Sequence, residues 1–430
     1  MSHSIKQLSR AGLVVAVAIV TTAVLTLPAA GSSASPNPPS PRWGLGMAYD
    51  AARRQVVLFG GQGEGPNCPL YGSCGDTWTW NGKTWTQLSP LHSPSPRYEE
   101  TMAYDEAHRR IVLYGGVSGR AGRDDTWLWD GTDWTERRIS GQRPTGYDMA
   151  RTYDSANGNV VVFDDQQRTW IWDGHGKRWT EISTAHAPSQ RAFAAMAYDP
   201  ALGTIVLFGG RAYGSGDDLA DTWTWDGTDW TQVSTPHSPS PRELTSMVYD
   251  ATMGQIVLFG GQSYPGCVGD TGVYGFCNDT WTWNGSDWTR LAPTHSPPPR
   301  TAAGMAYDAP RGRLVLFGGE FNGPSLGDTW VWDGHDWSLP AESVALSPSQ
   351  GPPGTIVQVT GLGFAANEVV RLNFIDSTNG RSFLAKVAAN ASGAFSTQVT
   401  IPVGASVGEQ RIRAKGSVSG QIVRQAFSVT

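Results

Sequence analysis

The sequence is poor in the features that mark catalytic, metal-binding and nucleic-acid-binding proteins. It contains no pair of histidines at metal-ligand spacing and no cluster of basic residues. Zinc sites and nucleic-acid interfaces each need one of these patterns. Only four cysteines occur in 430 residues, and only the N-terminal segment has an apolar run that approaches the length of a membrane span. We therefore expect no cofactor, no metal ion and no catalytic residue of a familiar type.

Residues 1–34 have the pattern of a secretory signal peptide, with Lys6 and Arg10 before an apolar run over 11–27 and small residues after it. An uncleaved anchor is the alternative, but the two threonines and the small-residue tail favour cleavage after Gly31 or Ala34. The mature chain would then be secreted or at the cell surface, without membrane insertion. Its formal charge changes from −6 to −8, which argues against a nucleic acid as partner. Residues 35–41 form a Pro-rich lead-in.

The chain has nineteen tryptophans, and eighteen of them fall into one motif, T-W-x-W-[DN]-G-x-x-W, that recurs six times with small variations. Successive copies are 49, 43, 53, 58 and 49 residues apart. A period near fifty residues indicates a repeat architecture in which each unit buries its apolar face against its neighbours. The copies begin at Trp78, Trp127, Trp170, Trp223, Trp281 and Trp330.

Each unit predicts four short strands, which in the first copy cover residues 43–49, 56–59, 77–80 and 85–88. Asn-Gly or Asp-Gly follows the third strand in all six copies, and this dipeptide predicts a two-residue type I′ hairpin. Small residues precede the recurrent Tyr-Asp of the first strand, as suits strands crowded around an axis. Because residues two apart on a strand share a face, the tryptophans are expected to pack between units rather than to bind a sugar.

These units resemble the kelch repeat: Pro-Arg before the first strand, an apolar strand that ends in Gly-Gly, and a Trp that closes the unit. The resemblance covers residues 42–340 and implies an all-β fold, a six-bladed β-propeller. Since each copy contains all four strands in order, we expect blade six to pack against blade one with little or no strand exchange.

Residues 341–430 contain no Trp, His, Cys or Tyr and alternate like strands. The segment SPSQGPPGTIVQVTGLGF, residues 347–364, resembles the start of an IPT/TIG-type immunoglobulin-like domain. That resemblance implies a C-terminal β-sandwich that acts as a spacer or an interaction module.

The cysteines lie in pairs within two loops, so local disulfides Cys68–Cys74 and Cys267–Cys277 are expected, as in exported proteins. The kelch propeller joined to an immunoglobulin-like domain is also similar to galactose oxidase. The copper site of galactose oxidase requires a Tyr-His pair and a histidine in the C-terminal domain. This chain has no Tyr-His dipeptide and no histidine after His335, so the resemblance implies the fold without the copper site.

The third unit departs from the others in a correlated way. Five units have Arg at the start of the first strand and Asp before the first Thr-Trp, whereas the third has Gly146 and Arg168 there, and Asp164-Asp165 in place of Gly-Gly. This joint loss favours a structural Arg–Asp unit, with a ligand-binding ring of arginines as the alternative. Four recurrent loop histidines, His92, His186, His237 and His295, are expected to be solvated.

Two function classes remain: a non-catalytic binding or adhesion protein that recognises a glycan or a protein, and an extracellular carbohydrate-active enzyme of unrecognised type. The first is favoured because no unit supplies a catalytic set. Loops between the second and third strands vary most in length, and binding residues concentrate on such loops. The ligand is expected across blades five, six and one. The candidate binding residues are Tyr71, Tyr264, Tyr274, Phe276, Glu320, Phe321 and Asn322, with Arg42, Arg242 and Arg300 as further candidates.

Overall fold

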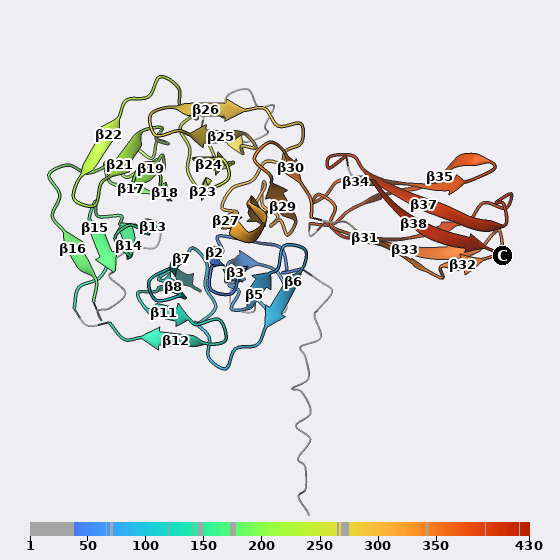
Figure 1. The fold of residues 1–430 in the computed structure, drawn as a ribbon, viewed down its shortest axis with the longest axis horizontal. Coiled ribbons are helices and arrows are strands. Elements are labelled where there is room, and N and C mark those ends of the chain that lie inside the picture. Colours follow the sequence, from blue (N-terminus) through green and yellow to red (C-terminus); the bar gives the residue numbers. More distant parts are fainter. Residues whose placement is uncertain are drawn as a thin grey trace, which may run out of the picture. The chain divides into compact units, whose positions relative to one another are not determined.

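The structure is a computed structural model that describes residues 38–65, 67–68, 72–119, 121–139, 141–144, 149–172, 178–264, 266–267, 275–340, 343–391, 393–420 and 422–430. The signal segment, residues 35–37 of the lead-in, Tyr71, Tyr274 and Gly146 lie outside these residues. The described regular structure is almost entirely β (Figure 1), apart from a short 3₁₀ turn, η2 (Ala309–Arg311).

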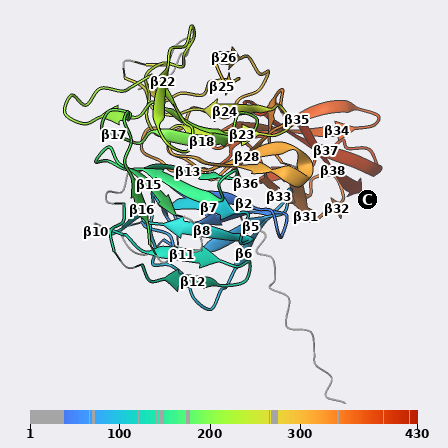
Figure 2. The same cartoon turned by 60° about the vertical axis from the view of Figure 1, so that its left-hand side comes forward.

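Six four-stranded antiparallel sheets surround a common axis and form a β-propeller (Figure 1). Their strands, here called A to D from the axis outward, follow one another along the chain, as blade two displays in Figure 2. Blades one to three consist of β2 (Gly46–Asp50), β3 (Gln55–Phe59), β5 (Thr77–Trp80) and β6 (Trp85–Leu88); β7 (Thr101–Asp105), β8 (Arg110–Tyr114), β11 (Thr126–Trp129) and β12 (Trp134–Arg137); and β13 (Ala150–Asp154), β14 (Asn159–Phe163), β15 (Thr169–Trp172) and β16 (Thr180–Ile182). Blades four to six consist of β18 (Ala195–Asp199), β19 (Thr204–Phe208), β21 (Thr222–Trp225) and β22 (Trp230–Val233); β23 (Ser246–Asp250), β24 (Gln255–Phe259), β25 (Thr280–Trp283) and β26 (Trp288–Leu291); and β27 (Gly304–Asp308), β28 (Arg313–Phe317), β29 (Thr329–Trp332) and β30 (Trp337–Ser338). The predicted six-bladed, all-β architecture is confirmed.

The loops between strands B and C contain the two-residue strands β4 (Gln62–Gly63), β9 (Val117–Ser118), β10 (Ala121–Gly122) and β20 (Arg211–Ala212). β4 and β20 pair with two strands that precede strand A of the same blade, β1 (Arg42–Trp43) and β17 (Arg191–Ala192), and β9 pairs with β10. Strand A begins, and the B–C loops lie, on one face of the propeller, which we call the loop face.

Each sheet comes from one continuous segment and no strand is exchanged between blades. The propeller is therefore closed by side-chain contacts between blade six and blade one. The last Trp of each blade packs against the aromatic residue that ends strand B of the preceding blade, with ring centroids 4.8–5.6 Å apart. At the closing junction Trp85 of blade one contacts Phe317 of blade six and donates a 2.9 Å hydrogen bond to Thr329 Oγ1. The recurrent tryptophans are therefore part of the scaffold.

The C–D hairpins differ from the two-residue type I′ turn that the sequence predicts. In blade one Trp80 pairs with Trp85, which leaves a four-residue loop over 81–84. Only Gly82 in this loop has a positive φ. The Asn81 side-chain oxygen accepts hydrogen bonds from the backbone N–H groups of Lys83 and Thr84, both at 2.9 Å. This Asx turn supplies the reversal that the prediction assigned to a type I′ backbone.

The inner strands are linked by a ring of backbone hydrogen bonds around the axis. A residue with positive φ stands two positions before strand A in five blades, and its N–H donates to the equivalent carbonyl of the preceding blade at four junctions. The donors are Leu244, Ala302, Gly44 and Glu99, and the acceptors are Phe193, Leu244, Ala302 and Gly44, at 2.6–3.1 Å. At the junction of blades two and three, the Arg151 guanidinium donates to the Glu99 carbonyl at 2.7 Å.

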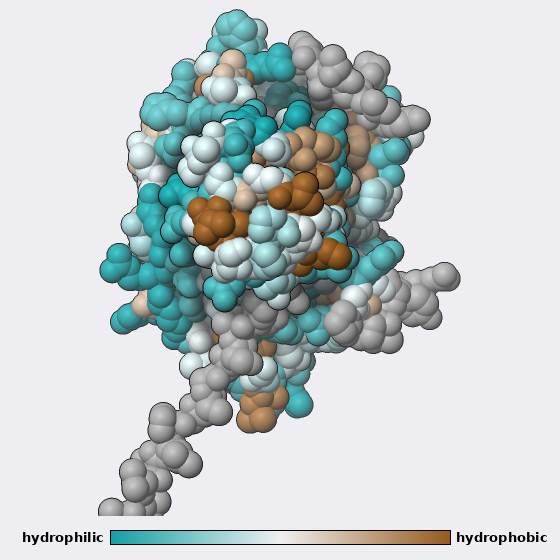
Figure 3. Space-filling view, turned by 90° about the vertical axis from the view of Figure 1, so that its right-hand side faces the viewer, coloured by the Kyte–Doolittle hydropathy of each residue, from teal (hydrophilic) through white to brown (hydrophobic). Residues whose placement is uncertain are grey.

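Residues after blade six form a β-sandwich of two sheets around one apolar core. Seven of the eleven large apolar side chains that the described surface exposes belong to this domain. Figure 3 shows apolar side chains as a small group within a mostly hydrophilic surface. One sheet contains β31 (Ser343–Ser347), β33 (Ile356–Leu362) and β36 (Phe395–Thr400); the other contains β32 (Gln350–Gly351), β38 (Ile422–Val429), β37 (Gly408–Gly416), β34 (Val369–Asp376) and β35 (Gly380–Ala388).

Candidate functional site

The arginines at the start of the blades are buried in a structural unit. Arg300 donates from Nη1 and Nη2 to the two carboxylate oxygens of Asp328 at 2.7 and 3.0 Å, and from Nη1 to the Gly318 carbonyl at 2.9 Å. Trp330 Nε1 donates to the same carboxylate at 2.8 Å. Burial would raise the pKa of Asp328, but the charge and hydrogen bonds of Arg300 outweigh it and the pKa is lowered. The bidentate pair therefore stays ionised inside the protein.

The same unit occurs in blades one, two, four and five, so the pairing favoured by the sequence is what the structure contains. The side chains of Arg42, Arg242 and Arg300 are fully buried, and their guanidinium groups are bonded to Asp76, Asp279 and Asp328. A ligand on the loop face has no access to these groups. We therefore assign the three arginines to the scaffold and leave them out of the candidate site.

Blade three rebuilds the unit from different residues. Asp164, which replaces the first glycine of Gly-Gly, accepts from Trp170 Nε1 at 2.8 Å and from Arg168 Nε at 2.9 Å. Its other oxygen accepts from the backbone N–H groups of Gln166 and Arg168. The carboxylate has moved to the end of strand B, and its cation comes from the short turn that follows.

The loop histidines are exposed to solvent, as predicted, and each is also paired with an aspartate. In four cases Nδ1 lies 2.7–2.8 Å from an Asp of the next blade's C–D hairpin, and that Asp also accepts from the histidine backbone N–H. The pairs clamp neighbouring blades at the rim. They are His92–Asp133, His186–Asp229, His237–Asp287 and His295–Asp336.

The B–C loops of blades four and five meet on the loop face. Tyr264 is 59% exposed, and its backbone N–H donates to the Asp218 carboxylate of blade four at 2.7 Å. Gln262 Nε2 donates to the Tyr264 hydroxyl at 2.6 Å, which fixes the ring. Arg211 and Glu243 form a second link, 3.6 Å long, between the same blades. Burial raises the pKa of the Asp218 carboxyl.

The B–C loops of blades five and six also touch, as the sequence predicts for loops of neighbouring blades. Phe276 and Phe321 meet edge to face with their ring centroids 5.4 Å apart. Glu320 exchanges backbone hydrogen bonds with Thr301, and burial raises the pKa of its carboxyl. Asn322 is exposed at the loop tip with a φ of 52°.

Both predicted disulfides are present, Cys68–Cys74 in blade one and Cys267–Cys277 in blade five. Each ties down one end of a long B–C loop. The candidates Tyr71 and Tyr274 lie in these loops but outside the described residues. The sequence analysis missed the contribution of blade four, namely Arg211, the exposed Tyr213, Asp218 and its partner Glu243 on blade five. The aromatic residue in the blade-four loop was the signal that could have found it.

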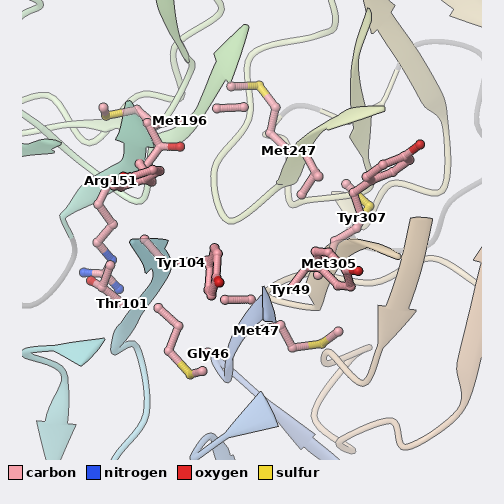
Figure 4. Close-up of a pocket in the computed structure, with 18 of the residues that line it drawn as sticks. Gly46, Met47, Tyr49, Thr101, Tyr104, Arg151, Met196, Met247, Met305 and Tyr307 are labelled. Carbon is pink, nitrogen blue, oxygen red and sulfur yellow. The ribbon is translucent and has the colours of Figure 1, made fainter. Parts of the chain in front are cut away.

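A cavity of about 520 Å³ runs along the propeller axis (Figure 4). The recurrent tyrosines of strand A, among them Tyr49, Tyr104 and Tyr307, line it together with a methionine from each of five blades. Blade three places Arg151 where the others have that methionine. The wall therefore combines aromatic and apolar side chains with the Arg151 guanidinium and with polar side chains such as those of Thr101 and Ser246.

Glu100 of blade two lies beside Arg151 in the lining of this cavity. Its Oε1 accepts from the Gly46 N–H at 2.9 Å, and burial raises its pKa to about 8, against the opposing effect of hydrogen bonds and of Arg97 and Arg151. Both ionisable groups already have backbone partners, so we assign the pair to the junction of the blades. Among the described residues, no group of three or more His, Cys, Asp or Glu side chains is arranged to hold a metal ion.

Comparison with known proteins agrees with this geometry. Residues 156–338 match the KLHDC2/KLHL20/DRC7 Kelch-repeats domain, and residues 341–429 match the macroglobulin-like domain. The chain thus carries a kelch-repeat β-propeller followed by an immunoglobulin-like domain, and this combination indicates a binding, protein-interaction role. The matching model for the second domain is macroglobulin-like, where the sequence resembled the IPT/TIG type.

Two solved structures are similar to parts of the chain. One, described as YCF48 bound to D1 peptide, is 14% identical over 71% of this chain and 85% of that chain, with a TM-score of 0.39. The other, macromomycin, is 19% identical over 21% of this chain and 100% of that chain, with a TM-score of 0.18. The described residues contain no helix with the length and hydrophobicity of a membrane span.

Proposed function

We propose that this protein is an exported, non-catalytic binding protein whose loop face takes a protein ligand over blades four, five and six. The observation that carries the proposal is the continuity of the face. The Tyr264–Asp218 hydrogen bond joins the loops of blades four and five, and the Phe276–Phe321 contact joins those of five and six. Loops held together in this way lose little conformational entropy when they bind.

The chemistry of the face fits a protein segment with basic residues. Tyr213 and Tyr264 expose their rings on neighbouring blades, and tyrosine is frequent among the residues that dominate protein interfaces. The Asp218 carboxylate accepts from the Tyr264 N–H, and Glu320 lies in the loop of blade six. Burial raises the pKa of both carboxyls, so a cationic partner would lower the cost of their ionised state. Phe276 and Phe321 pack edge to face on each other, so these two rings do not form a flat platform on which a sugar could stack.

The test uses the purified protein against an array of peptides graded from acidic to basic, with a glycan array in parallel. We expect basic peptides to bind, and the double variant Tyr213→Ala/Tyr264→Ala to weaken binding at least about tenfold. Leu202→Ala, an exposed apolar residue in the A–B turn on the opposite face, is the control and should bind as the native protein does. Binding to glycans alone, or unchanged peptide binding in the double variant, would contradict the proposal.

Export is part of this proposal and is supported by the signal pattern and by the two disulfides. Protein recovered from the culture medium should begin at Ser32 or Ser35, after cleavage behind Gly31 or Ala34. N-terminal sequencing measures this directly. Protein found only inside cells with Met1 retained would remove the export from the proposal and leave the binding face to its own test.

A further inference from the structure

All the cationic residues of the C-terminal domain lie on one sheet. Residues 341–430 contain seven cations and four anions, a net charge of +3, whereas residues 1–340 carry −9. The seven cations occupy β34, β35, β37 and β38 of the five-stranded sheet. They are Arg371, Arg381, Lys386, Arg411, Arg413, Lys415 and Arg424, which we call the basic face.

The register of the strands places these residues on the same side of the sheet. Arg411, Arg413 and Lys415 alternate along β37 and therefore share a face. Residues paired across a ladder point to the same side, and Arg371 of β34 pairs with Lys386 on one neighbour and with Lys415 on the other.

The other cations belong to the same face because of further cross-strand residue pairs. Arg413 of β37 pairs directly with Arg424 of β38. Ile375 of β34 pairs with Arg381 and with Arg411 on its two neighbours. Four adjacent strands, each about 4.8 Å from the next, thus carry one continuous cationic surface.

The basic face holds like charges close together, although like charges repel each other. Six of the seven cations are exposed, and Arg413 is buried in their midst. Burial lowers the pKa of Arg413, and the charges of Arg381, Arg424 and Arg371 lower it further. In the described part of the domain, the basic face has one ion pair, between Arg411 and Glu409 at 3.8 Å. Like charges placed opposite each other on a sheet destabilise it, so the arrangement calls for an anionic partner that relieves the repulsion.

The side chains next to the cations restrict which class of anion the basic face can bind. Phe383 is the aromatic ring within the basic face, and the Arg371 guanidinium already lies over it at 5.2 Å, so there is no platform on which successive nucleic-acid bases would stack. Val369 and Ile422 are exposed beside the cations but are shorter than the arginines and lysines around them. Apolar groups of that length do not reach past the charged heads into a lipid layer.

We propose that the basic face binds a linear anionic polysaccharide, whose carboxylate or sulfate groups pair with the guanidinium and ammonium groups of the sheet. Bidentate pairing suits arginine, which supplies five of the seven cations. The sequence analysis found no basic cluster because the cations are dispersed over four strands, and only the pairing of these strands gathers them.

The test measures binding of the full-length protein to heparin and to polygalacturonate, with neutral dextran as the uncharged glycan. We expect both anionic chains to bind, dextran not to bind, and the affinity to fall steeply as salt is raised, because released counterions drive the association. The triple variant Arg371→Gln/Lys415→Gln/Arg424→Gln should lose about tenfold or more in affinity. Its melting temperature should not fall, since the variant relieves repulsion.

The matched control removes three exposed cations from the propeller, Lys83→Gln/Arg123→Gln/Arg290→Gln, and so has the same net charge. It should keep the affinity within about twofold, because net charge alone does not position the partner. Equal losses in both triple variants would overturn the proposal, as would binding only to anionic vesicles or only to single-stranded DNA. The Tyr213→Ala/Tyr264→Ala variant should bind the polysaccharide normally, so the two proposals succeed or fail separately.

Discussion

At the scale of single residues, Glu100 stands in surroundings that its side chain does not favour. Leu45, Ala194, Thr245 and Ala303 occupy the equivalent position in other blades, so an uncharged residue fits there. Glu100 is buried, and its Oε2 has no hydrogen-bond partner among the described residues. The proton that its raised pKa retains at neutral pH removes the cost of a buried charge.

This residue makes the stability of the propeller dependent on pH. The folded pKa of about 8 lies above the ordinary value of 4.5, so its contribution is complete below pH 4.5 and is lost as the pH rises to about 8. The loss amounts to about 1.4 kcal/mol for each pH unit in that window. Glu100→Gln has no proton to lose, so denaturant unfolding should show it gaining stability over the native protein between pH 5 and pH 8. A constant difference between the two proteins across this range would contradict the assigned pKa.

Arg151 is a second charged residue at a position that is uncharged in the other blades. Its position holds Met47, Met102, Met196, Met247 or Met305 in the other blades, so its charge is unexpected from the repeat. Its guanidinium donates to the Glu99 carbonyl, whereas at four other junctions the equivalent carbonyl accepts from a backbone N–H of the next blade. Arg151 therefore takes part in the ring of hydrogen bonds around the axis.

At the scale of elements, the Arg–Asp unit recurs in two forms of different burial. Arg300 and Asp328 are both fully buried, whereas the Arg168 side chain of blade three is 32% exposed over a buried Asp164. Removing one partner of a fully buried pair leaves an uncompensated charge. Asp164 keeps backbone and indole donors when its arginine is lost.

We therefore expect Arg300→Gln to destabilise the protein by about 3–5 kcal/mol. Arg168→Gln should cost about 1 kcal/mol or less, as for pairs that solvent reaches. Chemical denaturation of both variants at one pH makes the comparison, with Lys83→Gln as the surface control. Equal losses of unfolding free energy in the two variants would mean that burial does not determine how much the Arg–Asp pair stabilises the protein.

The whole molecule shows which features a single sequence can predict. The Trp motif is periodic and local, so it fixed the number of blades and the order of strands. The Arg–Asp unit was also predictable, because blade three lost both members together. The predicted hairpin type was wrong because the hydrogen bonds of the Asn81 side chain compete with the backbone geometry that the Asn-Gly dipeptide favours.

The candidate site was only partly predictable, since it depends on contacts between loops far apart in the chain. Neighbouring blades imply that the loops of Phe276 and Phe321 are adjacent, but nothing local indicates that Asp218 bonds to the backbone of Tyr264. The basic face is hidden for the same reason. Its cations come from four strands whose register the alternating pattern alone does not determine.

The uniform geometry of the tryptophans has an optical consequence. In every blade the last two tryptophans of the motif lie 5.2–5.7 Å apart with their ring planes tilted by 44–47°. Indoles this close share their electronic excitation, and we expect six pairs of such uniform separation and tilt to give exciton couplets that add in the far-ultraviolet circular dichroism spectrum. Residues 341–430 contain no tryptophan, so this band belongs to the propeller alone. Its loss on heating should report the separation of the blades, independently of the light absorbed by the C-terminal domain.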